Sequence, residues 1–281
     1  HWSIPIDLLS QLEPAMSDLE SLREIRDTSV HIHREETAQA RERKWRQLIG
    51  SAAIGHGELI TDLPPDRGLG KGLYAPTTLA NELIDLFDGA QEEILIVSAY
   101  LIPTPALEGA VERAVARGVR VRILTNSIRY NNHLTAHSAY RNHVNQQFRD
   151  GADLHEVRVD ARDRAFYMIT PIDHKALALH AKAMTIDRDK VFVGSANLDP
   201  RSLRINSEMA LLVESEELNA ALREARMRDF SPANAWHLQL DEDDGVVWVS
   251  DRKTLTTQPA ANFMQRIEDW FFAFLPLEDE L

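Results

Sequence analysis

The stretch that decides the fold is LHAKAMTIDRDKVFVGSANLDPRSLRINSEMALLVES, residues 179–215. It holds three runs that are typical of β-strands, at 179–187, 190–195 and 207–213. Gly194 lies near the end of the second run, where the backbone can turn sharply. We expect the polar residues around these runs to converge at one end of a sheet.

Polar side chains of this stretch come in pairs that are two residues apart. Successive side chains on a strand point to opposite faces, so each pair shares a face. The pairs are His180 with Lys182, Ser195 with Asn197, and Asn206 with Glu208. Asp187 follows His180 at an odd spacing, so we expect it to point to the other face and to stand apart.

These residue types suit chemistry on an oxyanion. An imidazole acts as a nucleophile or a proton donor near neutral pH. An ammonium and an amide stabilise the oxygens of a phosphoryl group, and a carboxylate can hold an imidazole in one tautomer. A metal site is disfavoured here, because Lys182 places a positive charge beside His180 and no cluster with ligand spacing surrounds them. The group therefore predicts a site for a phosphoryl group.

Outward from this stretch, the chain alternates helix and strand patterns. Further strands are predicted at 93–99, 119–125 and 153–159, and helices at 78–89, 104–118, 137–150 and 216–228. Thr78 and Ser215 are the expected N-caps of the first and last of these helices. The strand–helix–strand unit at 93–125 predicts a right-handed parallel crossover. The fold class is α/β, a mixed β-sheet sandwiched by helices.

The pattern changes again after Ser231. WHLQL and VVWVS flank DEDDG, which predicts a hairpin with an Asp244-Gly245 turn. A calcium loop is excluded for the acidic run, because its fifth ligand position would be Gly245 and no Glu stands at the twelfth. An aromatic amphipathic helix is predicted at 262–275. We expect it to pack against the rest of the chain, because its acidic neighbours would be repelled by anionic headgroups.

Composition limits the classes of function. The 281 residues hold 31 Lys plus Arg and 44 Asp plus Glu, a formal net charge of −13. This balance argues against a protein that neutralises a long nucleic acid. The chain has no cysteine, which excludes disulfides, thiolate nucleophiles and cysteine-based zinc sites. The Pro- and Gly-rich segment 61–76 is expected to be a linker and does not match a phosphate loop.

The motif H-x-K-x(4)-D followed by x(6)-G-S-x-N resembles the signature of the phospholipase D superfamily. It matches at every defined position: His180, Lys182, Asp187, Gly194, Ser195 and Asn197. The continuation through Leu198–Ser202, then Asn206 and Glu208, is similar to the bacterial cardiolipin synthase branch in particular. The resemblance covers roughly residues 73 to 281 and implies a phospholipase D-like lobe with a small C-terminal hairpin-plus-helix extension.

The resemblance implies a role for each matching position. His180 would be one of two active-site histidines, of which one attacks phosphorus to give a phosphohistidine and the other protonates the departing alcohol. Lys182 and Asn197 would hold the phosphoryl oxygens, and Ser195 would add a hydrogen bond. Glu208 would bind and orient a histidine. The remaining motif residue, Asp187, would be structural. No metal and no cofactor is implied.

The family's site needs two such motifs, and this chain holds one. Either the chain begins after the first motif of a two-lobed protein, or a single-motif chain pairs with a second copy across a twofold axis. The first residue, His1 rather than Met, and the segment 1–5 favour the first explanation. Under it, His180 belongs to the second motif and is the general acid rather than the nucleophile, and this chain alone would be inactive.

The implied function is that of a cardiolipin synthase-type phosphatidyltransferase acting on phosphatidylglycerol or a related phospholipid. The alternative is a phospholipase D-type hydrolase, or a phosphodiesterase or nuclease of the same superfamily. The other histidine would come from a missing first lobe or from a second copy. Peripheral contact with the cytoplasmic side of a bacterial cell membrane is expected, and nucleic acid is not an expected partner because the net charge is −13.

The expected division of the chain is a helical remnant and linker at 1–72, a catalytic lobe at 73–230 and the extension at 231–281. Tyr100 follows the strand at 93–99 and is a candidate for the substrate cleft, with a packed aromatic side chain as the alternative. The polar stretch from Asn126 to His133 has the same two interpretations, a substrate-contacting loop or an ordinary one.

Overall fold

A computed structural model describes residues 38–62, 77–128, 140, 143–148, 150–168, 177–260, 265 and 267. The chain divides into two compact units, His1–Ala52 and Ala53–Leu281. In the first unit the described secondary structure is helix α3 (Ala38–Gly50), whose side chains are mostly exposed. All strands of the described ranges belong to the second unit.

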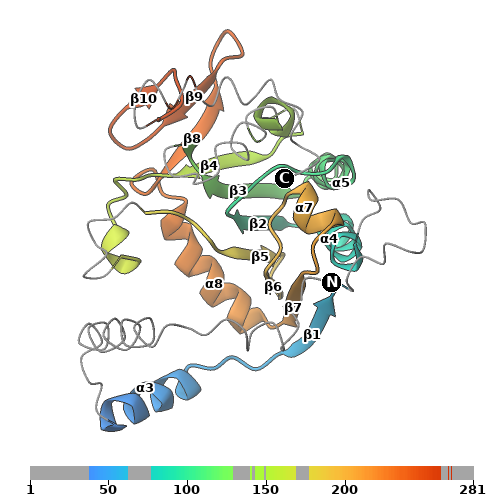
Figure 1. Ribbon diagram of the computed structural model, residues 1–281, viewed down its shortest axis with the longest axis vertical. Coiled ribbons are helices and arrows are strands. Elements are labelled where there is room, and N and C mark those ends of the chain that lie inside the picture. Colours follow the sequence, from blue (N-terminus) through green and yellow to red (C-terminus); the bar gives the residue numbers. More distant parts are fainter. Residues whose placement is uncertain are drawn as a thin grey trace, which may run out of the picture. The chain divides into compact units, whose positions relative to one another are not determined.

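One 10-stranded sheet forms the second unit, in the order β1-β7-β6-β5-β2-β3-β4-β8-β9-β10 (Figure 1). Neighbouring strands are antiparallel except for β2 with β3 and β3 with β4, which are parallel. The strands are β1 (His56–Thr61), β2 (Glu93–Ser98), β3 (Arg120–Asn126), β4 (Asp153–Val157), β5 (Lys182–Ile186), β6 (Lys190–Gly194), β7 (Met209–Glu214), β8 (Ala235–Leu240), β9 (Val246–Val249) and β10 (Thr254–Leu255).

Helices cover both faces of this sheet. Figure 1 shows α8 (Glu216–Asp229) on one side, and α4 (Thr78–Gly89) with α5 (Pro105–Ala116) on the other. Strand β2 is buried along its whole length because its successive side chains enter two different cores. Ile94 and Ile96 belong to one core, and Leu95 and Val97 belong to the other. The short α7 (Pro200–Arg204) and the 3-10 turn η2 (Arg164–Phe166) lie in connections. The predicted fold class is confirmed.

Several local predictions hold. Strands β2 and β3 are parallel and joined through α5, as the crossover required. Ser215 caps α8 by accepting a bond from the Leu218 amide at 3.3 Å. Hairpin β8–β9 turns at Asp244, which has a φ of 59°, and Gly245. Because β8 pairs with β4, this hairpin continues the main sheet.

Other predictions differ from the structure or lie outside its described part. Thr77, not Thr78, caps α4, because its hydroxyl accepts the Ala80 amide at 3.2 Å. Strand β1 escaped prediction, since HGELIT buries only Ile60 and lies at the sheet edge. The helix at 137–150 is described only in part. Most of the helix at 262–275 and most of the 61–76 linker lie outside the described residues. The domain limits at 72 and 230 stay predictions.

None of the helices within the described ranges combines the length and the apolar character that a membrane-spanning segment requires.

Asp187 fastens the β5–β6 turn to the start of β2. It adopts the left-handed conformation, with a φ of 50°, and its carboxylate accepts the backbone amides of Gln91 at 3.0 Å, Glu92 at 2.7 Å and Glu93 at 3.2 Å. Its own amide donates to the Glu93 carbonyl at 2.8 Å. One carboxylate thus pairs three backbone donors where a strand begins.

Replacing this carboxylate tests its structural contribution. We expect Asp187→Ala to lower the free energy of unfolding by about 1–3 kcal/mol, because three backbone amides, of which that of Glu93 is partly buried, lose their acceptor. Urea denaturation measures the change. Asp189→Ala, two residues on in the same turn, is the matched control and should stay within about 0.5 kcal/mol of the parent. Equal losses in the two variants would contradict the assignment.

Candidate active site

The register of four strands brings the predicted residues to one row of strand ends, which we call the catalytic edge because the predicted catalytic residues lie there. At this edge β2 ends where β5 begins, with Ser98 opposite Lys182, and β6 ends where β7 begins, with Gly194 opposite Ala210. The Ser98 hydroxyl donates to the Tyr100 carbonyl at 2.7 Å and accepts the Leu198 amide at 3.3 Å. This hydroxyl therefore joins the loop after β2 to the loop after β6.

His180 and Lys182 are in contact at this edge. His180 lies just before β5 and is exposed, so the two side chains meet at the start of the strand. Lys182 Nζ donates to the His180 carbonyl at 2.9 Å and lies 3.3 Å from His180 Nδ1. Because an ammonium only donates, Nδ1 accepts in this contact and Nε2 carries the proton of the neutral ring.

Burial weakens the hold of Lys182 on its proton. The pKa of Lys182 is lowered chiefly because its ammonium is partly desolvated, and the carboxylates of Asp199 and Glu208 oppose that shift. Those two carboxylates therefore lie close enough to act on the ammonium. The Lys182 ammonium contacts His180 and is acted on by two carboxylates, and it can exchange one of these neighbours for an anionic ligand.

Ser195, Asn206 and Glu208 form a second group beside β6 and β7. Glu208 accepts a short hydrogen bond from the Ser195 hydroxyl and a 3.0 Å bond from the Asn206 amide. The Ser195 hydroxyl also accepts the Met209 amide at 3.1 Å. Among the described residues, Glu208 makes no hydrogen bond with His180, so its role in orienting a histidine stays a prediction.

Gly194 permits this arrangement through its missing side chain. A Cβ added here would lie 2.6 Å from the Met209 carbonyl oxygen and 2.8 Å from the Ala210 Cβ. Strands β6 and β7 approach so closely at this point that only glycine fits. The close approach is what sets Ser195 within reach of Glu208.

Asn197 and Asp199 complete the edge from the loop before α7. Asn197 is half-buried, and its Oδ1 is buried without a hydrogen-bond partner in the described part of the chain. Asp199 caps α7 by accepting the Ser202 amide at 2.7 Å, and burial raises its pKa. Asp199 was not among the predicted site residues. Its sequence signal, an Asp-Pro pair, is typical of a helix start and does not by itself indicate a site.

Tyr100 reaches the same edge and is half-buried. Burial raises the pKa of its phenol, with a smaller contribution from the charge of Asp199. The substrate-binding role predicted for Tyr100 stays a prediction. Asp187 is the motif residue that does not join the others, since it lies at the far end of β5 from His180. Of the polar stretch 126–133, only Asn126, Ser127 and Ile128 are described.

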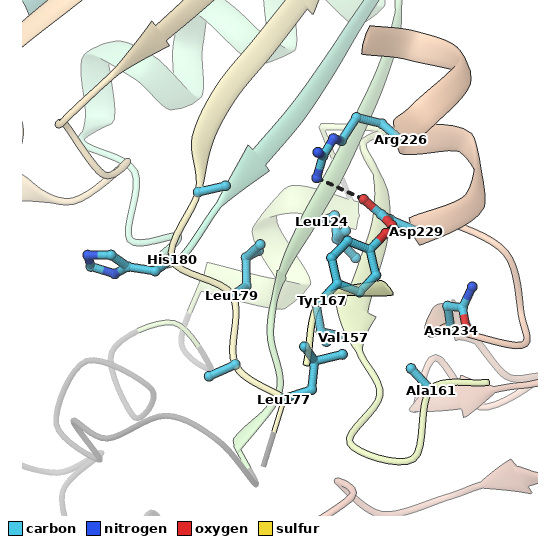
Figure 2. Close-up of a pocket in the computed structure, with 12 residues that line it drawn as sticks. Leu124, Val157, Ala161, Tyr167, Leu177, Leu179, His180, Arg226, Asp229 and Asn234 are labelled. Carbon is cyan, nitrogen blue, oxygen red and sulfur yellow. Dashed lines mark hydrogen bonds and ion pairs between the residues drawn. The ribbon is translucent and has the colours of Figure 1, made fainter. Parts of the chain in front are cut away.

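A largely apolar pocket lies behind the segment that carries His180. Its volume is about 230 Å³, and its lining includes Leu124, Leu177 and Leu179. At one side Tyr167 bonds to Asp229, which also accepts Arg226 at 2.9 Å. Figure 2 shows the His180 imidazole directed away from this group. His180 and Ala181 are nevertheless among the lining residues, so the pocket adjoins the catalytic edge at the 177–181 segment.

Comparison with known proteins identifies the family. Residues 83–229 match the family described as "Cardiolipin synthase, PLD-like domain", and the chain belongs to this family and so to the phospholipase D superfamily. It is 34% identical over 226 residues to cardiolipin synthase C of Escherichia coli K12. This match covers 78% of this chain and 47% of that protein. Cardiolipin synthase A of Pseudomonas syringae is 29% identical over 182 residues, covering 65% of this chain and 32% of that protein.

The chain thus spans about half the length of cardiolipin synthase C, and its match to cardiolipin synthase A covers 32% of that protein. Among solved structures, the phospholipase D family member Nuc of Salmonella typhimurium aligns with a TM-score of 0.42 at 20% identity, covering 62% of this chain and 93% of that one.

Phosphate binding tests the role of the Lys182 cation. We expect Lys182→Ala to weaken binding of inorganic phosphate to this chain about tenfold or more, because a charge-assisted hydrogen bond is lost. Lys190→Ala is the control and should change the affinity little, because Lys190 begins β6 at the end of the strand opposite to Gly194. Titration followed by ³¹P NMR measures both.

The same titration has a predicted pH dependence. A lysine with a lowered pKa is fully charged below that pKa and loses its charge as the pH rises through it. In the alkaline range, where phosphate stays a dianion, affinity should therefore fall at a lower pH than an ordinary lysine would dictate. If the affinity for phosphate fell only at the usual lysine pKa, or did not fall at all, the partly buried position of Lys182 would be contradicted.

Proposed function

We propose that this chain is the C-terminal half of a cardiolipin synthase-type phosphatidyltransferase. The observation that carries the proposal is the contact between His180 and Lys182 at an open sheet edge, beside the Ser195–Glu208 pair. Family membership and the cardiolipin synthase names of the relatives support the substrate class. Phosphatidylglycerol is the proposed phospholipid.

The proposed reaction passes through a phosphohistidine. A second histidine, from outside this chain's motif, attacks the phosphorus of the donor lipid while the bond to its headgroup oxygen breaks. The Nε2 proton of His180 goes to that oxygen, and the headgroup alcohol leaves. His180 then takes the proton of the acceptor lipid's hydroxyl, whose oxygen displaces the histidine from phosphorus. The atoms of the donor and acceptor lipids are all accounted for in the diphosphatidyl product and the released alcohol.

Lys182 and Asn197 are proposed to hold the phosphoryl oxygens during both steps. The ammonium would leave Nδ1 of His180, from which it is 3.3 Å away, for the more strongly charged acceptor. Asn197 lies on the loop before α7, and its amide would donate to a second phosphoryl oxygen. Burial lowers the pKa of Lys182, and the two nearby carboxylates oppose that shift by favouring the cation.

The second histidine is proposed to come from another lobe that carries the first motif, and a second copy of this chain is the alternative source. An apolar stripe supports such pairing, because it crosses β1, β7 and β6 beside the catalytic edge. Leu59 pairs with Leu211, which pairs with Val193, and these side chains are 64%, 44% and 48% exposed. A stripe of this kind is typical of a surface that a partner covers.

We also propose that the enzyme works peripherally at the cytoplasmic face of a bacterial membrane, since its substrates are bilayer lipids. The net charge of −13 would repel an anionic surface, so contact is expected to be confined to the rim of the catalytic edge.

Turnover by the complete two-motif protein tests the proposed function. With vesicles of labelled phosphatidylglycerol as substrate, we expect cardiolipin and free glycerol, and a loss of at least about a thousandfold for His180→Ala. His56→Ala, an exposed histidine on β1, is the control and should retain activity. Phosphatidic acid without cardiolipin would indicate a hydrolase instead, and cleavage of DNA that falls steeply with salt would indicate a nuclease.

The apolar stripe can be tested separately. We expect Leu211→Asp to disrupt pairing, because a buried interface would have to accept an unpaired carboxylate. Leu240→Asp is a closely matched control, since Leu240 is also 44% exposed but lies on β8. Sedimentation of this chain reports pairing between copies, and activity of the complete protein reports pairing between lobes. If the two variants behave alike in both measurements, the stripe is not the pairing surface.

A further inference from the structure

A cluster of two histidines and an aspartate lies at a distance from the catalytic edge. Asp153 is the first residue of β4, so it stands at the opposite end of the parallel strands from the carboxyl end of β2. His155 follows two residues later on the same face, and its register partner on β8 is His237. Two strands therefore present three ligand-type side chains to one point.

The three side chains already converge on one oxygen atom. Asp153 Oδ1 lies 3.0 Å from His155 Nε2 and 2.9 Å from His237 Nε2. The two imidazoles are stacked with their centroids 4.6 Å apart and their planes at 6°. One ligand atom from each of the three residues lies within 4.8 Å of the others.

We propose that Asp153, His155 and His237 bind a divalent transition-metal ion, with Zn²⁺ the best fit. Two imidazole nitrogens and one carboxylate oxygen form a donor set that Zn²⁺ accepts, with water in a fourth position. At metal–ligand distances of about 2.0–2.1 Å, tetrahedral ligands are about 3.3 Å apart. The observed contacts of 2.9 and 3.0 Å to Asp153 need to open by only a few tenths of an ångström. The two rings must tilt toward each other.

The surroundings support the ligand geometry. Arg122 Nε donates to Asp153 Oδ2 at 3.1 Å, which fixes the carboxylate and leaves Oδ1 as a single donor atom. His155 is 6% exposed, whereas Asp153 and His237 are each 37% exposed, so an ion can enter from solvent.

The unused nitrogen of His237 can keep a hydrogen-bond partner when its Nε2 binds the metal. Gln239 Nε2 donates to His237 Nδ1 at 3.0 Å, and the Nδ1 atom of His155 is buried with no hydrogen-bond partner in the described part of the chain. Metal binding at Nε2 moves each ring's proton to Nδ1, and a turned Gln239 amide then accepts it from His237. The ion would cross-link β4 to β8 and thereby hold the hairpin to the sheet.

Calorimetric titration of this chain with Zn²⁺ tests the proposal. We expect one Zn²⁺ to bind, a visible Co²⁺ spectrum of tetrahedral type and a raised melting temperature at saturation. His237→Ala and Asp153→Asn should each raise the dissociation constant at least about tenfold and abolish the thermal shift. His56→Ala, a histidine on β1, should leave all three measurements unchanged.

His237→Gln guards against a trivial loss of folding, because an amide can keep the hydrogen bond to Asp153 but is a poor zinc ligand. It should fold as the parent does and still lose the tight site. The proposal is overturned if the parent chain does not bind Zn²⁺, or if the variants at 153 and 237 bind it as tightly as the parent. In that case the three residues form a hydrogen-bonded cluster only. Neither result bears on the proposed transferase activity.

Discussion

The site depends on the hydrogen-bonded register of β2, β5, β6 and β7. That register places two strand ends and two strand starts at one edge, so residues far apart in sequence become neighbours there. The tightest point is Gly194, where a Cβ would come within 2.6 Å of a carbonyl oxygen on β7. A shift of one residue would turn Ser195 away from Glu208, since side chains alternate between faces. Backbone pairing therefore determines whether the predicted catalytic groups meet.

The electrostatics of the edge follow from the same geometry. Lys182 is partly buried beside His180; burial lowers the pKa of its ammonium, and the carboxylates of Asp199 and Glu208 oppose that shift. A cation in this position is neither freely solvated nor locked into one ion pair. Such a group can pass from protein acceptors to a phosphoryl oxygen with little rearrangement, which is a requirement of preorganised catalysis.

Much of this arrangement was predictable from the sequence, and the parts that were not share a physical cause. The fully buried run EILIVS predicted β2, and the Asp244-Gly245 turn predicted the β8–β9 hairpin. Strand β1 was not predictable because only Ile60 is buried in it and its pairing with β7 is tertiary. The His155–His237 pair was not predictable either, since it arises from the register of two strands, which pairs histidines that are 82 positions apart in the chain.

Strand β1 also affects where this chain can be shortened. Just beyond it, the Asp62 amide donates to the Glu208 carbonyl at 2.9 Å, and the Asp62 carboxylate accepts the Leu79 amide at 2.9 Å. A fragment that began at residue 73 would lose both anchors and would leave β7 as an unpaired edge next to Ser195. Exposed edges of that sort recruit other strands and promote aggregation. Expression boundaries for this lobe therefore belong upstream of residue 56, even though the family match begins at residue 83.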